Sequence, residues 1–161
     1  MQTIIKVGMA ELNIIQEPGI LTTLGLGSCV GIILYDRVIK TGGLVHIMLP
    51  SSKQVKNNEN KAKFADTGIQ LLFNKMLERG CLKSRIIAKI AGGSQMFSFQ
   101  SDNDMMKIGK RNVLATKEVL SFLRIPITSE DTGGNYGRTI EFHTTSGKLI
   151  IKTIGHGVHE I

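Results

Sequence analysis

Short runs of apolar and β-branched residues, separated by glycine-rich turns, dominate the first fifty residues. Such runs predict β-strands, because they lack the helical repeat of apolar positions. Two of them, residues 30–35 and 44–49, are almost continuously apolar, which predicts strands covered on both faces. Residues 36–43 are expected to join these two strands as a hairpin. Three shorter strands are expected earlier, at residues 3–7, 12–16 and 20–24, with a turn at Pro18-Gly19.

Two later segments have helical periodicity. In residues 61–79, four apolar residues recur at alternating steps of four and three: Ala65, Ile69, Leu72 and Met76. Gly80 follows where a helix commonly ends on a glycine. A second helix is expected at residues 110–123, ended by Pro126. Its predicted apolar stripe consists of Ala115, Val119 and Phe122.

The remaining strands form a cluster at the end of the chain. They are expected at residues 127–130, 139–143 and 149–154, after one strand at residues 86–91 that lies between the helices. Residues 156–160 are expected to be a frayed tail. Because strands cluster and the helices do not alternate with them, the pattern predicts an α+β fold. We expect one domain, residues 1–161, with largely antiparallel or mixed β-sheets and two main helices.

Composition narrows the classes of function. The net formal charge is +7, yet the basic residues are scattered, and Trp is absent. No nucleic-acid surface with stacked bases is therefore expected, and an acidic protein is the favoured partner. No apolar run approaches the roughly 18 residues of a membrane span. The N-terminus also lacks the pattern of a signal peptide, so we expect a cytoplasmic protein without membrane insertion.

The two cysteines, Cys29 and Cys81, lack the spacing of a metal or redox site and are expected to be reduced thiols. Cys81 follows a predicted helix end and is interpreted as structural. His156 and His159 lack a second pair of ligands, so no metal site is expected there.

Cys29 has the sequence context of a nucleophile. It follows a Gly-x-Gly-Ser run and precedes a predicted buried strand. Such a position places a thiol at the edge of a sheet, where glycine backbone lets a substrate carbonyl approach closely. Backbone N–H groups around Ser28 and Cys29, with support from Gly27, could form an oxyanion site. The alternative interpretation is that Cys29 is a small buried apolar residue without a catalytic role.

His46 is the candidate base, because it lies within the otherwise apolar strand 44–49. The hairpin return could bring its imidazole beside Cys29, which needs a base to form a thiolate. Thr22 and Thr23 both offer a hydroxyl that could orient the second ring nitrogen. A hydrogen-bonded core histidine is the alternative interpretation.

Longer strings of residues connect the chain to a known family. They are TLGLGSCVG (residues 23–31), GLVHIMLP (43–50), KFAD (63–66), KIAGGSQMF (89–97), IGKRN (108–112) and DTGGNYGR (131–138). In this order, and over nearly the whole chain, the sequence resembles the CheD family of chemoreceptor glutamine deamidases.

The resemblance implies a layered α/β sandwich and a thiol-dependent amidohydrolase that converts receptor Gln side chains to Glu, releasing ammonia. By its motifs, Cys29 is the nucleophile, His46 the general base and Thr23 the third member of the triad. Neither a metal nor an organic cofactor is implied. The implied partners are the cytoplasmic helices of methyl-accepting chemotaxis receptors and CheC, whose CheY-phosphate phosphatase activity the protein is expected to stimulate.

Two alternatives to this function stay open at the level of sequence. One is a binding module that mainly regulates CheC and keeps only residual catalysis. The other is a receptor glutamate methylesterase, because a Cys–His–Thr site could also cleave a γ-glutamyl ester.

Overall fold

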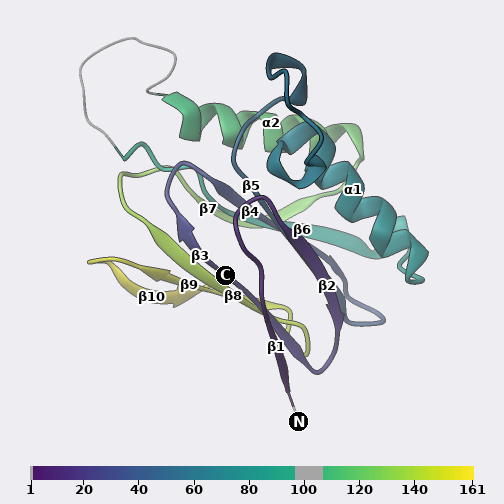
Figure 1. Ribbon diagram of the computed structural model, residues 1–161. Helices are drawn as coiled ribbons and strands as arrows, with labels where there is room; N and C mark the ends of the chain where they lie inside the picture. Colours follow the sequence, from purple (N-terminus) through teal and green to yellow (C-terminus); the bar gives the residue numbers. More distant parts are fainter. Residues whose placement is uncertain (1, 97–106) are drawn as a thin grey trace.

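Three layers stack in the computed structural model, which describes residues 2–96 and 107–161: a pair of helices, a central sheet and an outer sheet (Figure 1). The helices are α1 (Ala65–Glu78) and α2 (Ile108–Phe122). The central sheet has the order β2 (Leu12–Gln16), β5 (Thr41–Ile47), β4 (Val30–Asp36), β6 (Ile86–Gly92), β7 (Ile127–Thr132). The outer sheet has the order β1 (Thr3–Lys6), β3 (Gly19–Leu26), β8 (Arg138–His143), β9 (Lys148–Thr153), β10 (Gly157–Glu160). Short 3₁₀ turns occupy Ser52–Gln54, Lys61–Lys63 and Lys83–Arg85.

Both sheets are mixed. β1 pairs with β3 in parallel and β6 pairs with β7 in parallel, whereas the other pairs of neighbours are antiparallel. β4 and β5 form the predicted hairpin. The α+β class, the layered sandwich and the two main helices expected from sequence are therefore confirmed.

Two apolar cores hold the layers together. One lies between the helices and the central sheet, and it includes Ile69, Leu72 and Met76 of α1. The other lies between the two sheets, around Leu21, Ile33 and Phe142. Every residue of β4 and β5 is buried, because these strands belong to both cores at once. This double coverage is what their continuous apolar sequence predicts.

The apolar stripe expected on the second helix is partly wrong. Phe122 is 82% exposed, while Ala115 and Val119 are half-buried at the edge of the core. The buried line of α2 instead runs through Gly109, Asn112, Thr116 and Leu120. Hydropathy misplaces the face because a glycine and two polar residues occupy positions that face the protein interior.

The end of the chain is not a frayed tail, as expected from sequence, but strand β10, paired antiparallel with β9. Ile161 continues the pairing, because its backbone N–H and C=O both bond to Leu149. The hydropathy pattern does not predict this strand, because all four of its residues are exposed at the sheet edge and none contributes a buried apolar side chain. Part of the KIAGGSQMF string, Phe97, lies outside the described residues. Neither α1 nor α2 is long and apolar enough to span a bilayer.

Candidate active site

Cys29, His46 and Thr23 all lie in the space between the two sheets. In the β4–β5 pair, Gly31 stands directly opposite His46. Cys29 precedes Gly31 by two residues, so its side chain points to the same face, diagonally across from the imidazole. Gly31 lets the outer sheet pack closely against β4 here, because a Cβ at this position would lie 2.8 Å from Cδ1 of Ile140. The hairpin therefore brings the predicted nucleophile and base to one face.

Thr23 reaches the same histidine from the outer sheet. Its Oγ1 lies 2.7 Å from Nδ1 of His46 and donates a hydrogen bond to the carbonyl oxygen of Val7 at 2.6 Å. A hydroxyl has one proton, and a carbonyl oxygen only accepts. Thr23 must therefore accept from an Nδ1–H, which leaves Nε2 of His46 with a free lone pair. Thr22, the other candidate, instead donates to Ile140 O.

The imidazole of His46 is fully buried, and within the described part of the chain its Nε2 has no hydrogen-bond partner. Burial lowers the pKa of His46 from 6.5 to about 4. The backbone is bound to the segment before β2, because His46 accepts from Ala10 N at 2.9 Å and donates to Glu11 O at 3.1 Å. The result is a rigid, neutral histidine whose one unused acceptor faces the interior.

The thiol of Cys29 is also neutral at rest. It is 8% exposed, and burial raises its pKa even though a hydrogen bond from its own backbone N–H acts in the opposite direction. A neutral thiol and a neutral imidazole on one face, with no hydrogen bond between them, differ from a preformed thiolate–imidazolium pair. Ionisation of Cys29 in this site therefore requires transfer of the thiol proton to a nearby base.

The nucleophile turn, residues 25–29, begins with Gly25 in the left-handed region. Gly27 donates to Gly25 O at 3.0 Å, a hydrogen bond that closes the turn just before Ser28 and Cys29. Ser94 N donates to Gly27 O and Gly93 N to Cys29 O, both at 2.8 Å. The turn is thus bound to the backbone that follows β6.

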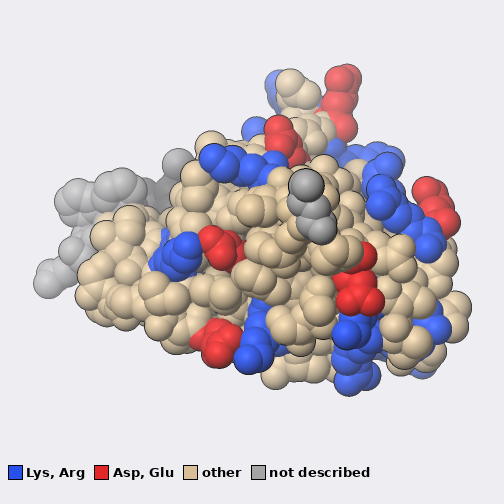
Figure 2. Space-filling view, turned by 90° about the horizontal axis from the view of Figure 1, so that it is seen from below, with Lys and Arg blue, Asp and Glu red and all other residues tan. Residues whose placement is uncertain are grey.

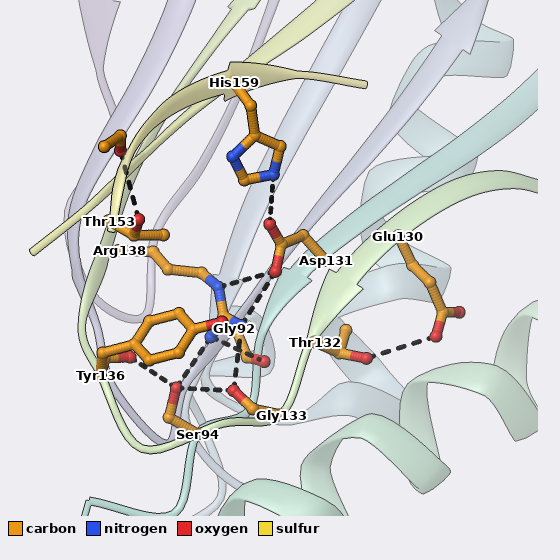
Figure 3. A network of polar contacts seen from close by, with 11 residues as sticks. Gly92, Ser94, Glu130, Asp131, Thr132, Gly133, Tyr136, Arg138, Thr153 and His159 are labelled. Atoms are coloured by element: carbon orange, nitrogen blue, oxygen red, sulfur yellow. Dashed lines mark hydrogen bonds and ion pairs between the residues drawn. The ribbon is translucent and has the colours of Figure 1, made fainter. Parts of the chain in front are cut away.

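A buried arginine is hydrogen-bonded to that backbone segment (Figure 3). Arg138 is 2% exposed and forms an ion pair with Oδ1 of Asp131 at 2.9 Å. The other carboxylate oxygen of Asp131 lies 2.6 Å from Nε2 of His159, on β10. The guanidinium also lies over the ring of Tyr136, with its Cζ 4.6 Å from the ring centroid. The cation is therefore paired and hydrogen-bonded, as a charge at this depth must be.

The same guanidinium binds the segment on which the nucleophile turn rests. Arg138 donates to Oγ of Ser94 at 2.8 Å and to Gly133 O at 2.9 Å. Ser94 in turn contacts Gly133 O and Tyr136 O (Figure 3). The glycine-rich sequence of residues 131–138 fits either a loop at the rim of the site or a plain turn. It does not reveal that Arg138 is buried, since a single Arg beginning a strand has the pattern of a surface residue.

Charges on the face opposite the helices are mixed. Lys and Arg side chains are interspersed with Asp and Glu in this view (Figure 2). Lys152 pairs with Glu141 at 2.7 Å and Lys148 with Glu160 at 3.6 Å on the outer sheet. Basic and acidic residues are thus interspersed on this face, in line with the scattered basic residues of the sequence.

Known proteins resemble this chain along most of its length. The family described as "CheD chemotactic sensory transduction" matches residues 48–153. A protein of Caldanaerobacter subterraneus named "Probable chemoreceptor glutamine deamidase CheD" is 61% identical over 158 residues, 98% of each chain. The "Chemoreceptor glutamine deamidase CheD" of Bacillus subtilis is 55% identical, covering 96% of this chain and 93% of its own. The protein of that name from Halalkalibacterium halodurans is 52% identical over the whole of both chains. With this identity over nearly its full length, the chain belongs to the CheD family.

Proposed function

We propose that this protein is a chemoreceptor glutamine deamidase, an amidohydrolase that converts Gln side chains of receptor cytoplasmic helices to Glu. The names of its relatives supply the substrate class. One observation supports the chemistry: His46 is hydrogen-bonded through Nδ1 to Thr23, while its unpartnered Nε2 shares a face with Cys29. That arrangement suits a general base for a thiol.

In the proposed first half of the reaction, Nε2 of His46 takes the Cys29 proton as the sulfur attacks the side-chain amide carbon of the substrate. Because both groups are neutral at rest, proton transfer accompanies attack. The N–H groups of Ser28 and Cys29 stabilise the oxyanion. Gly27 supports them by hydrogen-bonding within the turn and to Ser94 N. The imidazolium then protonates the leaving nitrogen, the C–N bond breaks, and ammonia departs from a thioester.

In the second half, His46 removes a proton from water, which attacks the thioester carbonyl. The C–S bond breaks, the proton passes to the Cys29 sulfur, and the product is Glu. Thr23 keeps the ring in the tautomer that both halves require, because it can only accept from Nδ1 while it donates to Val7 O. Each product Glu adds a negative charge to the receptor. No step uses a metal or an organic cofactor.

We also propose that CheC is a second partner and that binding of this protein stimulates its CheY-phosphate phosphatase activity. This proposal rests on the family alone. The +7 net charge supports acidic protein partners in general, through faster encounter. A receptor substrate would place the reaction at the cytoplasmic face of the membrane.

The direct test incubates receptor cytoplasmic fragments with the wild type and with Cys29→Ala, then maps Gln-to-Glu conversion by peptide mass. We expect conversion with the wild type only. Equal conversion by the variant would exclude Cys29 as the nucleophile. Methanol release from a methylated receptor, without deamidation, would favour the methylesterase.

CheC stimulation needs a separate measurement of phosphatase rate with the wild type and with Cys29→Ala. We expect both to stimulate, because binding does not need the thiol. Stimulation without deamidation by the wild type would favour the binding module over the enzyme.

A further inference from the structure

Asn112, on α2, contacts both segments that carry the proposed catalytic pair. Its side chain is fully buried. Its Nδ2 donates to Ser28 O at 2.9 Å and to Met48 O at 3.0 Å. Ser28 directly precedes Cys29, and Met48 follows His46 by two residues. One amide group from the helix layer thus bridges the nucleophile turn and the end of β5.

The chemistry of the two contacts fixes the orientation of this amide. Both partners are carbonyl oxygens, which only accept, so the NH₂ end of Asn112 must face them. Its Oδ1 is buried and has no hydrogen-bond partner in the described part of the chain. Leaving such an oxygen unsatisfied costs about 1–3 kcal/mol. An apolar residue at this position would give neither carbonyl oxygen a donor.

Close backbone packing brings this short side chain within reach. Gly109, one turn before Asn112, lies so close to Ser94 O that an added Cβ would collide with it. On the other side, a Cβ on Gly93 would collide with the Val113 side chain and lie 2.9 Å from Gly109 O. The two glycines let α2 lie directly on the segment that binds Cys29 O.

We propose that Asn112 is a positioning residue, which sets the separation between Cys29 and His46 by holding the carbonyl groups of Ser28 and Met48 on one amide. Its role in turnover rests on the proposed deamidase function, whereas its effect on the geometry of the thiol does not. Without the amide, two buried carbonyl oxygens lose their donor, and the turn can move relative to β5. Displacements of about 1 Å lower catalytic rates by about 100-fold.

The test compares Asn112→Ala and Asn112→Asp with Thr116→Ala. Thr116 is also fully buried on α2, one turn further on, and its Oγ1 contacts neither catalytic segment. Two readouts are needed: kcat and KM for deamidation of a receptor fragment, and the rate at which iodoacetamide alkylates Cys29. The alkylation of Cys81 in the same sample is the internal reference. Urea unfolding gives the folded fraction for each variant.

For Asn112→Ala we expect kcat to fall about 100-fold with KM within about twofold of the wild type. Alkylation of Cys29 should slow about tenfold relative to Cys81. Asn112→Asp keeps the size but sets a carboxylate against two oxygens, so its kcat relative to wild type should rise as the pH falls and the carboxyl group gains a proton. Thr116→Ala should keep both rates.

Unchanged kcat and alkylation in folded Asn112→Ala would overturn the proposal. So would losses that only follow the unfolded fraction, or equal losses in Thr116→Ala. If Asn112→Ala does not fold, the pH response of Asn112→Asp decides. If the wild type deamidates no receptor but Cys29 alkylation still depends on Asn112, the proposed function fails and the positioning role stands.

Discussion

Cys29 and Cys81 lie in two turns of similar construction. Both thiols are buried, 8% and 2% exposed, and burial raises the pKa of each, to about 11 for Cys81. Each turn also rests on an Asp–Arg ion pair. Arg138 and Asp131 support the first through Ser94. Asp36 supports the second turn. Its carboxylate pairs with Arg85 at 2.8 Å and accepts a hydrogen bond from Leu82 N, the residue after Cys81.

The two turns differ in what faces the sulfur. Cys29 shares its face with a neutral imidazole that has an unused lone pair. Cys81 is instead near charged groups. Asp36 raises the pKa of its thiol, whereas Arg85 and Arg79 lower it. Burial and a nearby ion pair therefore do not distinguish a nucleophile from a structural thiol. The proposed base on the same face as the sulfur does.

Replacing each cysteine in turn should give the largest contrast. Cys29→Ala should lower deamidation by about 10⁴-fold or more, because the nucleophile is lost. Cys81→Ala should keep kcat within about twofold and cost stability only through the small cavity it leaves. Initial rates on a receptor fragment and urea unfolding of both variants measure this. Comparable losses of activity in the two would remove the distinction between the turns.

The Asp131–Arg138 and Asp36–Arg85 ion pairs should differ in their effect on activity. Both should stabilise the fold, but only the first should affect the site. Asp131→Asn leaves the buried Arg138 without its counter-charge and should lower the free energy of unfolding by about 3 kcal/mol. It should also lower kcat, because Ser94 and the nucleophile turn shift. Asp36→Asn should destabilise by a similar amount and keep the kcat of the folded fraction.

The control for this pair of variants is Glu130→Gln, which breaks the exposed Lys117–Glu130 pair and should cost less than about 1 kcal/mol. Urea titrations give the stabilities, and kcat is corrected for the folded fraction. A fall in kcat with Asp36→Asn as deep as with Asp131→Asn would contradict the contrast.

Stability should depend on pH through His46. Its pKa in the folded protein, about 4, lies below the 6.5 of an unfolded histidine, so the unfolded chain takes up a proton first as the pH falls. The free energy of unfolding should therefore decrease by about 2 kcal/mol between pH 7 and pH 5 from this residue, and this contribution should level off below pH 4. Urea unfolding of the wild type and of His46→Gln, at both pH values, isolates the contribution. An equal pH dependence in the variant would rule His46 out as its source.

Thr23→Val should give the smallest of these effects. The variant keeps the shape of the side chain but loses the hydrogen bonds to Val7 O and to His46. We expect kcat to fall about tenfold, the equivalent of the one hydrogen bond that orients the imidazole. Cys29 alkylation should approach the rate of Cys81. Thr22→Val is the matched control and should keep both rates, because the Thr22 hydroxyl donates to Ile140 O and not to His46. Equal effects of the two substitutions would count against the assigned tautomer.

Local patterns of the sequence determined much of the scaffold. Continuous apolar runs located β4 and β5, and the spacing from Ala65 to Met76 located α1, because both depend on how side chains meet a neighbouring layer. The Gly-x-Gly-Ser-Cys turn and an isolated histidine in an apolar strand pointed to Cys29 and His46. The family motifs selected Thr23 over Thr22.

Tertiary structure alone decided the features that depend on which polar groups are paired in the interior. Nothing in the sequence near Asn112 or Arg138 marks these polar side chains as buried, because their partners lie on distant segments. β10 forms because β9 offers a free edge to a polar segment. The neutral state of the proposed catalytic pair likewise follows from burial between two sheets. Hydropathy measures the preference of one residue and not the shielding by its neighbours.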